Sequence, residues 1–287
     1  MLRRFHLLFV TAFFAAVSLS AQNPVPYGNN SAAGKYAEVN GIKMYYEIYG
    51  AGQPLLLLHG NGGSIGGRKK EIPEFAKKYK VIAVDSRCHG KTGCGVKELT
   101  YELMASDVKK LLDQLKIDSC LVWGHSDGGI LGLILAYKYP EKIKRLVTSG
   151  ANLQPDSSAV FPELIKMGTM MYAQVPDTMA RKHMRLLLEQ PHIPFDSLKK
   201  IKAPVLVMAG DRDAIREEHT VKIFQSIPNS QLCILPGTTH FVAKEKPELF
   251  MMIVTDFFEK PFAMPSMVKE VQKMLEPMSP PGKKSGK

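Results

Sequence analysis

The stretch GHSDG at residues 124–128 decides the fold. It follows an apolar, strand-like run at 119–124 and precedes a helical pattern at 128–139. The pattern Gly-x-Ser-x-Gly at a strand-to-helix turn is typical of a nucleophile elbow: the two glycines permit a turn too tight for side chains, and the serine hydroxyl is exposed. The alternative interpretation is an ordinary glycine-rich turn. We expect Ser126 to be a nucleophile.

Outward from this turn, short apolar runs alternate with helical patterns, which indicates an α/β fold with a parallel sheet and helices on both faces. Two alternating β runs within 36–49 flank Asn40-Gly41, which predicts a hairpin. Strands are expected at 54–60, 80–85, 119–124, 145–149, 203–210 and 231–235, and helices at 68–79, 99–115, 128–139, 218–227 and 247–259.

The alternation stops at residues 151–200, which contain no buried-strand run. We therefore divide the chain into a core at 36–150 and 201–260, and a helical cap inserted at 151–200. Residues 261–287 form a basic, proline-rich tail that we expect to be partly disordered. Five methionines of the cap either line an adaptable apolar pocket or pack the cap onto the sheet. They are Met167, Met170, Met171, Met179 and Met184.

A serine nucleophile needs a base and an orienting carboxylate, which in this arrangement follow in the order serine, acid, histidine. His240 comes just after the last predicted strand, so we expect it to be the base. Asp211 and Asp213 both follow the preceding strand. We take Asp213 as the acid and Asp211 as a structural loop carboxylate.

The oxyanion of the reaction intermediate needs two backbone N–H donors. One is expected from Asp127, the residue after the nucleophile. The other is expected from Asn61, in the glycine-rich loop that follows His59 and Gly60.

Taken together, five motifs in order make the chain resemble the α/β-hydrolase superfamily. They are HGNGG at 59–63, DSRCHGKT at 85–92, GHSDGG at 124–129, GDRD at 210–213 and GTTH at 237–240. The resemblance implies an eight-stranded, mostly parallel sheet and a Ser-His-Asp triad that needs no cofactor. Within the superfamily the chain is similar to the single-cap group of esterases, enol-lactonases and carbon–carbon bond hydrolases.

Two departures narrow this resemblance. Ser126 stands where similar epoxide hydrolases and haloalkane dehalogenases carry an aspartate, which disfavours those activities. The loop at 59–63 lacks the proline often seen in prolyl aminopeptidases and carbon–carbon bond hydrolases, which weakens both of those assignments.

At the N-terminus, residues 1–21 have the layout of a secretory signal peptide, with two arginines, an apolar run at 7–17 and small residues at 18–21. A membrane anchor is the alternative, but the apolar run is shorter than the about 20 residues that span a bilayer. We expect a periplasmic or secreted protein without stable membrane insertion after cleavage.

Composition excludes several classes of protein. The 287 residues are 45% hydrophobic and 23% charged, which is ordinary for a globular enzyme. The net charge of +11 is spread along the chain, so we expect no nucleic-acid partner. Four cysteines are too few for a disulfide scaffold, although Cys88 and Cys94 are close enough to pair. The cysteines and histidines show no metal-ligand spacing, so no metal is expected.

The sequence thus predicts a serine hydrolase that cleaves an ester-like bond of a small or medium acyl substrate. Two alternatives stay open: a non-catalytic ligand-binding protein on the same fold, and a cofactor-free perhydrolase or haloperoxidase activity on the same triad. The sequence does not distinguish esters from thioesters, lactones or amides, and it does not indicate an oligomeric state.

Overall fold

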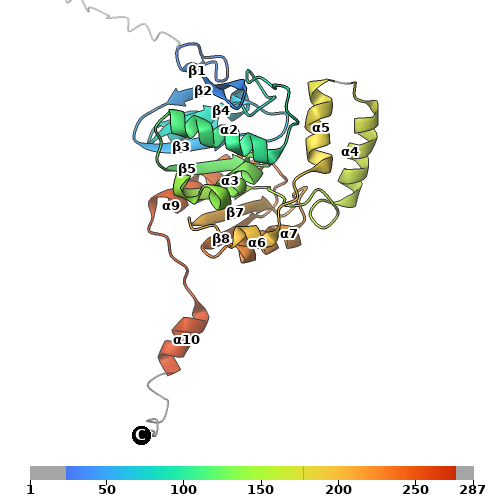
Figure 1. Cartoon of the computed structure of the whole chain (residues 1–287). Helices are drawn as coiled ribbons and strands as arrows, with labels where there is room; N and C mark the ends of the chain where they lie inside the picture. Colours follow the sequence, from blue (N-terminus) through green and yellow to red (C-terminus); the bar gives the residue numbers. More distant parts are fainter. Residues whose placement is uncertain (1–23, 177, 276–287) are drawn as a thin grey trace, which may run out of the picture.

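The computed structural model describes residues 24–176 and 178–275 and contains one eight-stranded sheet (Figure 1). The strand order is β1-β2-β4-β3-β5-β6-β7-β8. The strands are β1 Gly34–Val39, β2 Ile42–Tyr49, β3 Gln53–Leu58, β4 Tyr79–Val84, β5 Cys120–His125, β6 Ile143–Ser149, β7 Val205–Gly210 and β8 Ser230–Leu235. Strand β2 is antiparallel to both of its neighbours, and all pairs from β4 to β8 are parallel. This confirms the α/β fold with a mostly parallel sheet.

The first two strands form the expected hairpin. Val39 pairs with Ile42, which leaves a two-residue loop of Asn40 and Gly41. Both loop residues have positive φ, 41° and 80°, as a type I′ turn requires.

Helices cover both faces of the sheet. They are α1 Glu71–Ala76, α2 Tyr101–Gln114, α3 Asp127–Lys138, α4 Pro162–Gln174, α5 Met179–Glu189, α6 Phe195–Leu198, α7 Glu217–Ser226, α8 Val242–Glu245, α9 Pro247–Glu259 and α10 Met267–Leu275, with short 3-10 turns η1 Ile65–Arg68 and η2 Pro140–Lys142. Helices α2, α3, α6 and α7 bury their apolar residues in one core cluster, and α1, α8 and α9 bury theirs in a second cluster.

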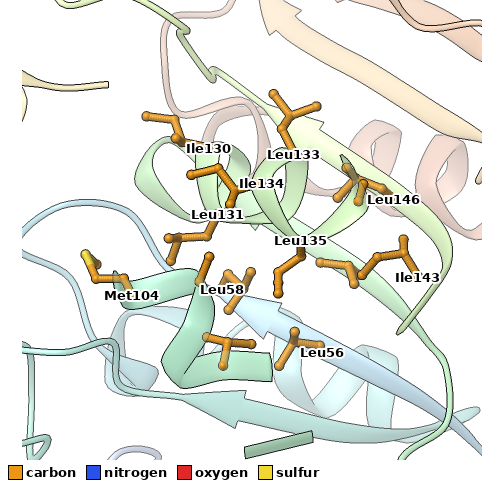
Figure 2. Packing of buried hydrophobic residues seen from close by; sticks show 14 of the residues in the cluster. Leu56, Leu58, Met104, Ile130, Leu131, Leu133, Ile134, Leu135, Ile143 and Leu146 are labelled. Carbon is orange, nitrogen blue, oxygen red and sulfur yellow. The ribbon is translucent and has the colours of Figure 1, made fainter. Parts of the chain in front are cut away.

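Helix α3 is the central element of the first cluster (Figure 2). Residues 130–136 are buried almost completely, without the polar face of a surface helix. They pack between Leu56 and Leu58 of β3, Met104 of α2 and Leu146 of β6. Since α3 begins directly after Ser126, this packing fixes the elbow to the core.

The helix expected at 68–79 is shorter than predicted. Gly66 and Gly67 lie in the 3-10 turn η1, and α1 runs only from Glu71 to Ala76. Pro73 is the third residue of α1, where its missing N–H costs no hydrogen bond. Tyr79 instead begins β4 and pairs with Gln53, because its ring is buried against the second cluster. Tertiary burial therefore overrides the helical periodicity.

Within residues 151–200, the described part of the chain holds helices α4, α5 and α6. Figure 1 shows α4 and α5 side by side, beyond the edge of the core. A single isolated bridge, Val160 to Ile215, connects this segment to the loop after β7. None of the helices in the described ranges has the length and apolar character that crossing a bilayer demands.

Candidate active site

The turn between β5 and α3 has the geometry of a nucleophile elbow. Ser126 has φ 54° and ψ −120°, a strained conformation for a residue with a side chain. A Cβ at position 124 would lie 2.0 Å from the Gly128 carbonyl oxygen, and one at 128 would lie 2.3 Å from the Leu58 oxygen. Both glycines are therefore sterically required, and the strain at Ser126 is maintained by the packing of α3 on β3.

The structure brings His240 and Asp213 together. His240 Nδ1 lies 2.6 Å from Asp213 Oδ1, and the aspartate side chain is 1% exposed. The same carboxylate accepts a hydrogen bond from the Ile215 N–H at 3.1 Å. Since a carboxylate can only accept, Nδ1 of the ring carries the proton and Nε2 is left to act as a base.

Asp211 does not contact the histidine. Its Oδ1 instead accepts a hydrogen bond from the Thr238 N–H at 3.2 Å. Backbone hydrogen bonds, that of Gly237 first, lower the pKa of this carboxyl. Asp211 thus fixes the loop after β8 that carries His240.

Ser126 and His240 line the same cavity, although no hydrogen bond joins the two side chains within the described residues. His240 sits directly over Gly150, where a Cβ would lie 2.7 Å from its Cε1. The hydrogen bond between a catalytic serine and histidine is often long in an enzyme without substrate, and it shortens in the reacting complex. Ser126, His240 and Asp213 follow β5, β8 and β7, so all three lie at the carboxyl edge of the parallel strands.

Two backbone N–H groups beside Ser126 make no hydrogen bond to any described residue and can bind an oxyanion. Asp127 is the first residue of α3, so its N–H has no partner inside the helix. The Asn61 N–H makes no backbone hydrogen bond within the described residues. The Asn61 loop lies against the elbow, since a Cβ on Gly60 would lie 3.0 Å from Ser126 Cβ.

The side chain of Asp127 has a role that no sequence motif indicates. It is 2% exposed and accepts hydrogen bonds from Tyr101 Oη at 2.7 Å and from Asn61 Nδ2 at 2.9 Å. Asn61 Nδ2 also donates to the His183 carbonyl oxygen of α5 at 3.2 Å. The Asp127 carboxylate therefore holds the loop at residues 59–63, here called the oxyanion loop, against the elbow. Asn61 also joins this loop to the cap. Burial raises its pKa to about 6, an effect that the two hydrogen bonds reduce.

The loop at residues 85–94 holds the oxyanion loop and the segment after it in place through hydrogen bonds. His89 Nε2 accepts a hydrogen bond from the Gly62 N–H at 3.0 Å, and Asp85 Oδ1 accepts one from the Ile65 N–H at 2.8 Å. A disulfide joins Cys88 to Cys94. These contacts give the motif at 85–92 a structural role.

The cavity over Ser126 has a volume of about 620 Å³, which suits a small or medium ligand. The cap supplies an apolar wall, formed by Leu164, Ile165, Met184, Leu187 and Leu188. The interpretation of the five cap methionines as a pocket lining is wrong for four of them. Met167, Met170, Met171 and Met179 are 42–57% exposed, because leucine and isoleucine occupy the inner faces of α4 and α5. Met179 contacts the core instead, since its Sδ lies 3.9 Å from Cys94 Sγ, whereas Met167, Met170 and Met171 are about half exposed.

Among the described residues, no three histidine, cysteine or carboxylate side chains cluster as a metal site would require. The arrangement at the cavity instead combines a strained serine, a histidine–aspartate pair and two free N–H donors, which are the parts of acyl-transfer chemistry.

The comparisons with known proteins agree with this geometry. A family model described as the alpha/beta hydrolase fold matches residues 53–190. The chain has the α/β-hydrolase fold and is similar to proteins of that superfamily. This confirms the resemblance seen in the sequence.

Similar proteins include a putative carbamate hydrolase of Azorhizobium caulinodans, 25% identical over 77% of this chain and 97% of that one. Another is a 2-hydroxy-6-oxo-6-(2'-aminophenyl)hexa-2,4-dienoic acid hydrolase of Metapseudomonas resinovorans, 26% identical over 79% of this chain and 91% of that one. Among solved structures, an enol-lactonase from Burkholderia xenovorans has a TM-score of 0.67 at 21% identity and covers 79% of this chain and 100% of its own.

Proposed function

We propose that this protein is a serine hydrolase that cleaves ester-like bonds of small or medium acyl substrates, with Ser126 as nucleophile, His240 as base and Asp213 as the orienting acid. The observation that carries the proposal is the contact between His240 Nδ1 and buried Asp213, with His240 lining one cavity with the strained Ser126.

In the proposed mechanism, the Ser126 oxygen attacks the substrate carbonyl carbon while His240 Nε2 takes the hydroxyl proton. Asp213 stabilises the imidazolium that forms. The N–H groups of Asp127 and Asn61 donate to the carbonyl oxygen as it becomes negative. His240 then protonates the departing alcohol, which leaves an acyl group on Ser126.

Hydrolysis of this acyl-enzyme completes the cycle. His240 takes a proton from water, the resulting hydroxide attacks the acyl carbon, and the serine oxygen leaves with the proton from the ring. The proposed steps use these three side chains, the two backbone N–H groups and water. The names of similar proteins include a carbamate hydrolase and an enol-lactonase, and carbamates and lactones both contain a carbonyl carbon that a nucleophile can attack.

The test is a series of 4-nitrophenyl esters from acetate to octanoate. We expect hydrolysis by the wild-type protein and a loss of kcat of at least about a thousandfold in Ser126→Ala and in His240→Asn. Ser158→Ala and His192→Asn change an exposed serine and an exposed histidine, and they serve as matched controls. If folded wild-type protein hydrolyses none of the esters but still binds small ligands, the non-catalytic alternative replaces this proposal.

We also propose that the protein is exported through the signal segment at residues 1–21 and works in the periplasm or outside the cell. The Cys88–Cys94 disulfide supports an oxidising compartment. N-terminal sequencing of protein from the periplasmic fraction should begin at residue 21 or 22. Recovery of a chain that begins at Met1 in the cytoplasm would contradict this.

A further inference from the structure

The cavity over Ser126 has one cationic wall. It is built by the segment that follows the oxyanion loop and by the start of α8. Arg68, Lys69, Lys70 and Lys244 line it, whereas Glu71 is the one carboxylate among the described residues that line the cavity. The three lysines are exposed at its mouth, but Arg68 lies inside. The cavity therefore favours a negatively charged ligand.

The Arg68 guanidinium packs against an aromatic ring, and none of its N–H groups donates a hydrogen bond to a described residue. Its guanidinium carbon lies 4.8 Å from the centroid of the Trp123 ring, and its side chain is 13% exposed. The nearest carboxylate, that of Glu71, is 4.0 Å away, beyond hydrogen-bond distance. Within the described ranges the guanidinium makes no hydrogen bond to another side chain or to the backbone, so its five N–H donors are available to a ligand.

Glu71 is a weak counter-ion for this guanidinium. Burial raises the pKa of the Glu71 carboxyl, and Arg68 only partly opposes this shift. A buried arginine without a close partner is costly, since its charge has lost most of its water. A carboxylate brought by the substrate would restore the missing partner with two parallel N–H···O bonds.

We propose that Arg68 is a specificity-determining residue that binds a carboxylate on the substrate. The substrates are then esters, or related acyl compounds, whose acyl or leaving group carries a carboxylate remote from the scissile carbonyl. This inference rests on the proposed hydrolase function. The apolar wall formed by α4 and α5 accommodates the hydrocarbon between the two polar ends of such a molecule.

Two pairs of esters test the proposal. 4-Nitrophenyl hydrogen adipate and 4-nitrophenyl hexanoate share the leaving group and six acyl carbons, and differ only in a terminal carboxylate. 4-Acetoxybenzoate and its methyl ester carry the same difference in the leaving group. The value of kcat/KM is measured for wild type, Arg68→Gln and Arg68→Lys. Lys200→Gln, which removes an exposed cation outside the cavity lining, is the control for net charge.

In at least one pair, we expect Arg68→Gln to lower kcat/KM for the charged ester by about tenfold or more while the neutral ester changes less than about twofold. Arg68→Lys should recover part of the loss, and Lys200→Gln should cause none. An equal loss for charged and neutral esters in both pairs, or no loss, would overturn the assignment. If wild type cleaves neither the charged nor the neutral ester of either pair, the hydrolase proposal itself fails, so the two failures are distinguishable.

Discussion

Asp211 and Asp213 are two residues apart after β7, and their contacts separate their roles. Asp213 bonds the His240 ring, whereas Asp211 bonds the backbone of the loop that carries it. The two positions are therefore a natural pair for testing which carboxylate orients the base.

Asp213→Asn should lower kcat for 4-nitrophenyl acetate by about 10³- to 10⁴-fold, because the amide no longer holds the ring with its proton on Nδ1. Asp211→Asn loses the charge and one of the two acceptor oxygens but does not touch the His240 ring, so we expect kcat to stay within about threefold and the free energy of unfolding to fall only slightly. Steady-state kinetics and urea unfolding measure both effects. Similar losses of kcat in the two variants would remove Asp213 from the triad.

For single residues, the sequence was sufficient to predict those site residues that belong to a local motif. Ser126, His240 and Asp213 each follow a strand in a recognisable order. By contrast, the Tyr101–Asp127–Asn61 contacts join three separate segments, and no spacing links residues 61, 101 and 127. The position of Arg68 against Trp123 depends on the packing of η1, which the predicted helix at 68–79 did not anticipate.

The buried Asp127 carboxyl makes stability depend on pH. Because its folded-state pKa of about 6 lies above the ordinary value, the folded protein keeps a proton between pH 4 and 6 that the unfolded chain has lost. The contribution of this group to the free energy of unfolding is thus fully present below pH 4. It is lost as the pH rises through 6.

Asp127→Asn lacks this titration. The free energy of unfolding of wild type minus that of the variant should therefore be about 2 kcal/mol larger at pH 4 than at pH 7.5. Urea unfolding at both pH values measures it. A difference that is the same at the two pH values would show that the carboxyl is ionised normally.

At the scale of elements, the loop at 85–94 connects the cap to the oxyanion loop. The Cys88 carbonyl oxygen lies 2.9 Å from His183 Nε2 of α5. The His89 ring stacks on the His183 ring with centroids 3.9 Å apart, and its Nε2 accepts from the Gly62 N–H. The Cys88–Cys94 bridge closes the loop at 85–94. It therefore restricts the conformations of a loop that contacts both the cap and the oxyanion loop.

Removing the bridge should cost stability. For a loop of this size, the double variant Cys88→Ser/Cys94→Ser should lose about 2 kcal/mol of unfolding free energy, because its unfolded chain is less restricted. Dithiothreitol should lower the stability of wild type to that of the double variant and leave the double variant unchanged. A reductant effect of equal size on both proteins would assign the change to something other than this disulfide.

For the whole molecule, the alternation of apolar runs and helical patterns was sufficient to predict the sheet, because strands buried on both faces have few other arrangements. The inner face of the cap was not predictable. Methionine, leucine and isoleucine have similar burial tendencies, and the side of α4 that faces Ser126 is set by how α4 docks on α5 rather than by its own sequence.

Helix α10 is exposed along all of its nine residues and lies apart from the sheet in Figure 1. Before this helix, Phe262 packs against the second core cluster and Gln231 Nε2 donates a hydrogen bond to the Ala263 carbonyl oxygen. A chain ending at Met264 should therefore keep the unfolding midpoint and the kcat of the full chain. A lower midpoint in thermal unfolding would show that the segment after 264 stabilises the core.

The central claim is that Ser126 is an activated nucleophile. Labelling of the purified protein with a fluorophosphonate, followed by peptide mass spectrometry, is the experiment that tests it. We expect one phosphonate per chain, on Ser126, with no labelling of Ser126→Ala and strongly slowed labelling of His240→Asn. Folded wild-type protein that stays unlabelled, or that is labelled on another residue, would contradict the account.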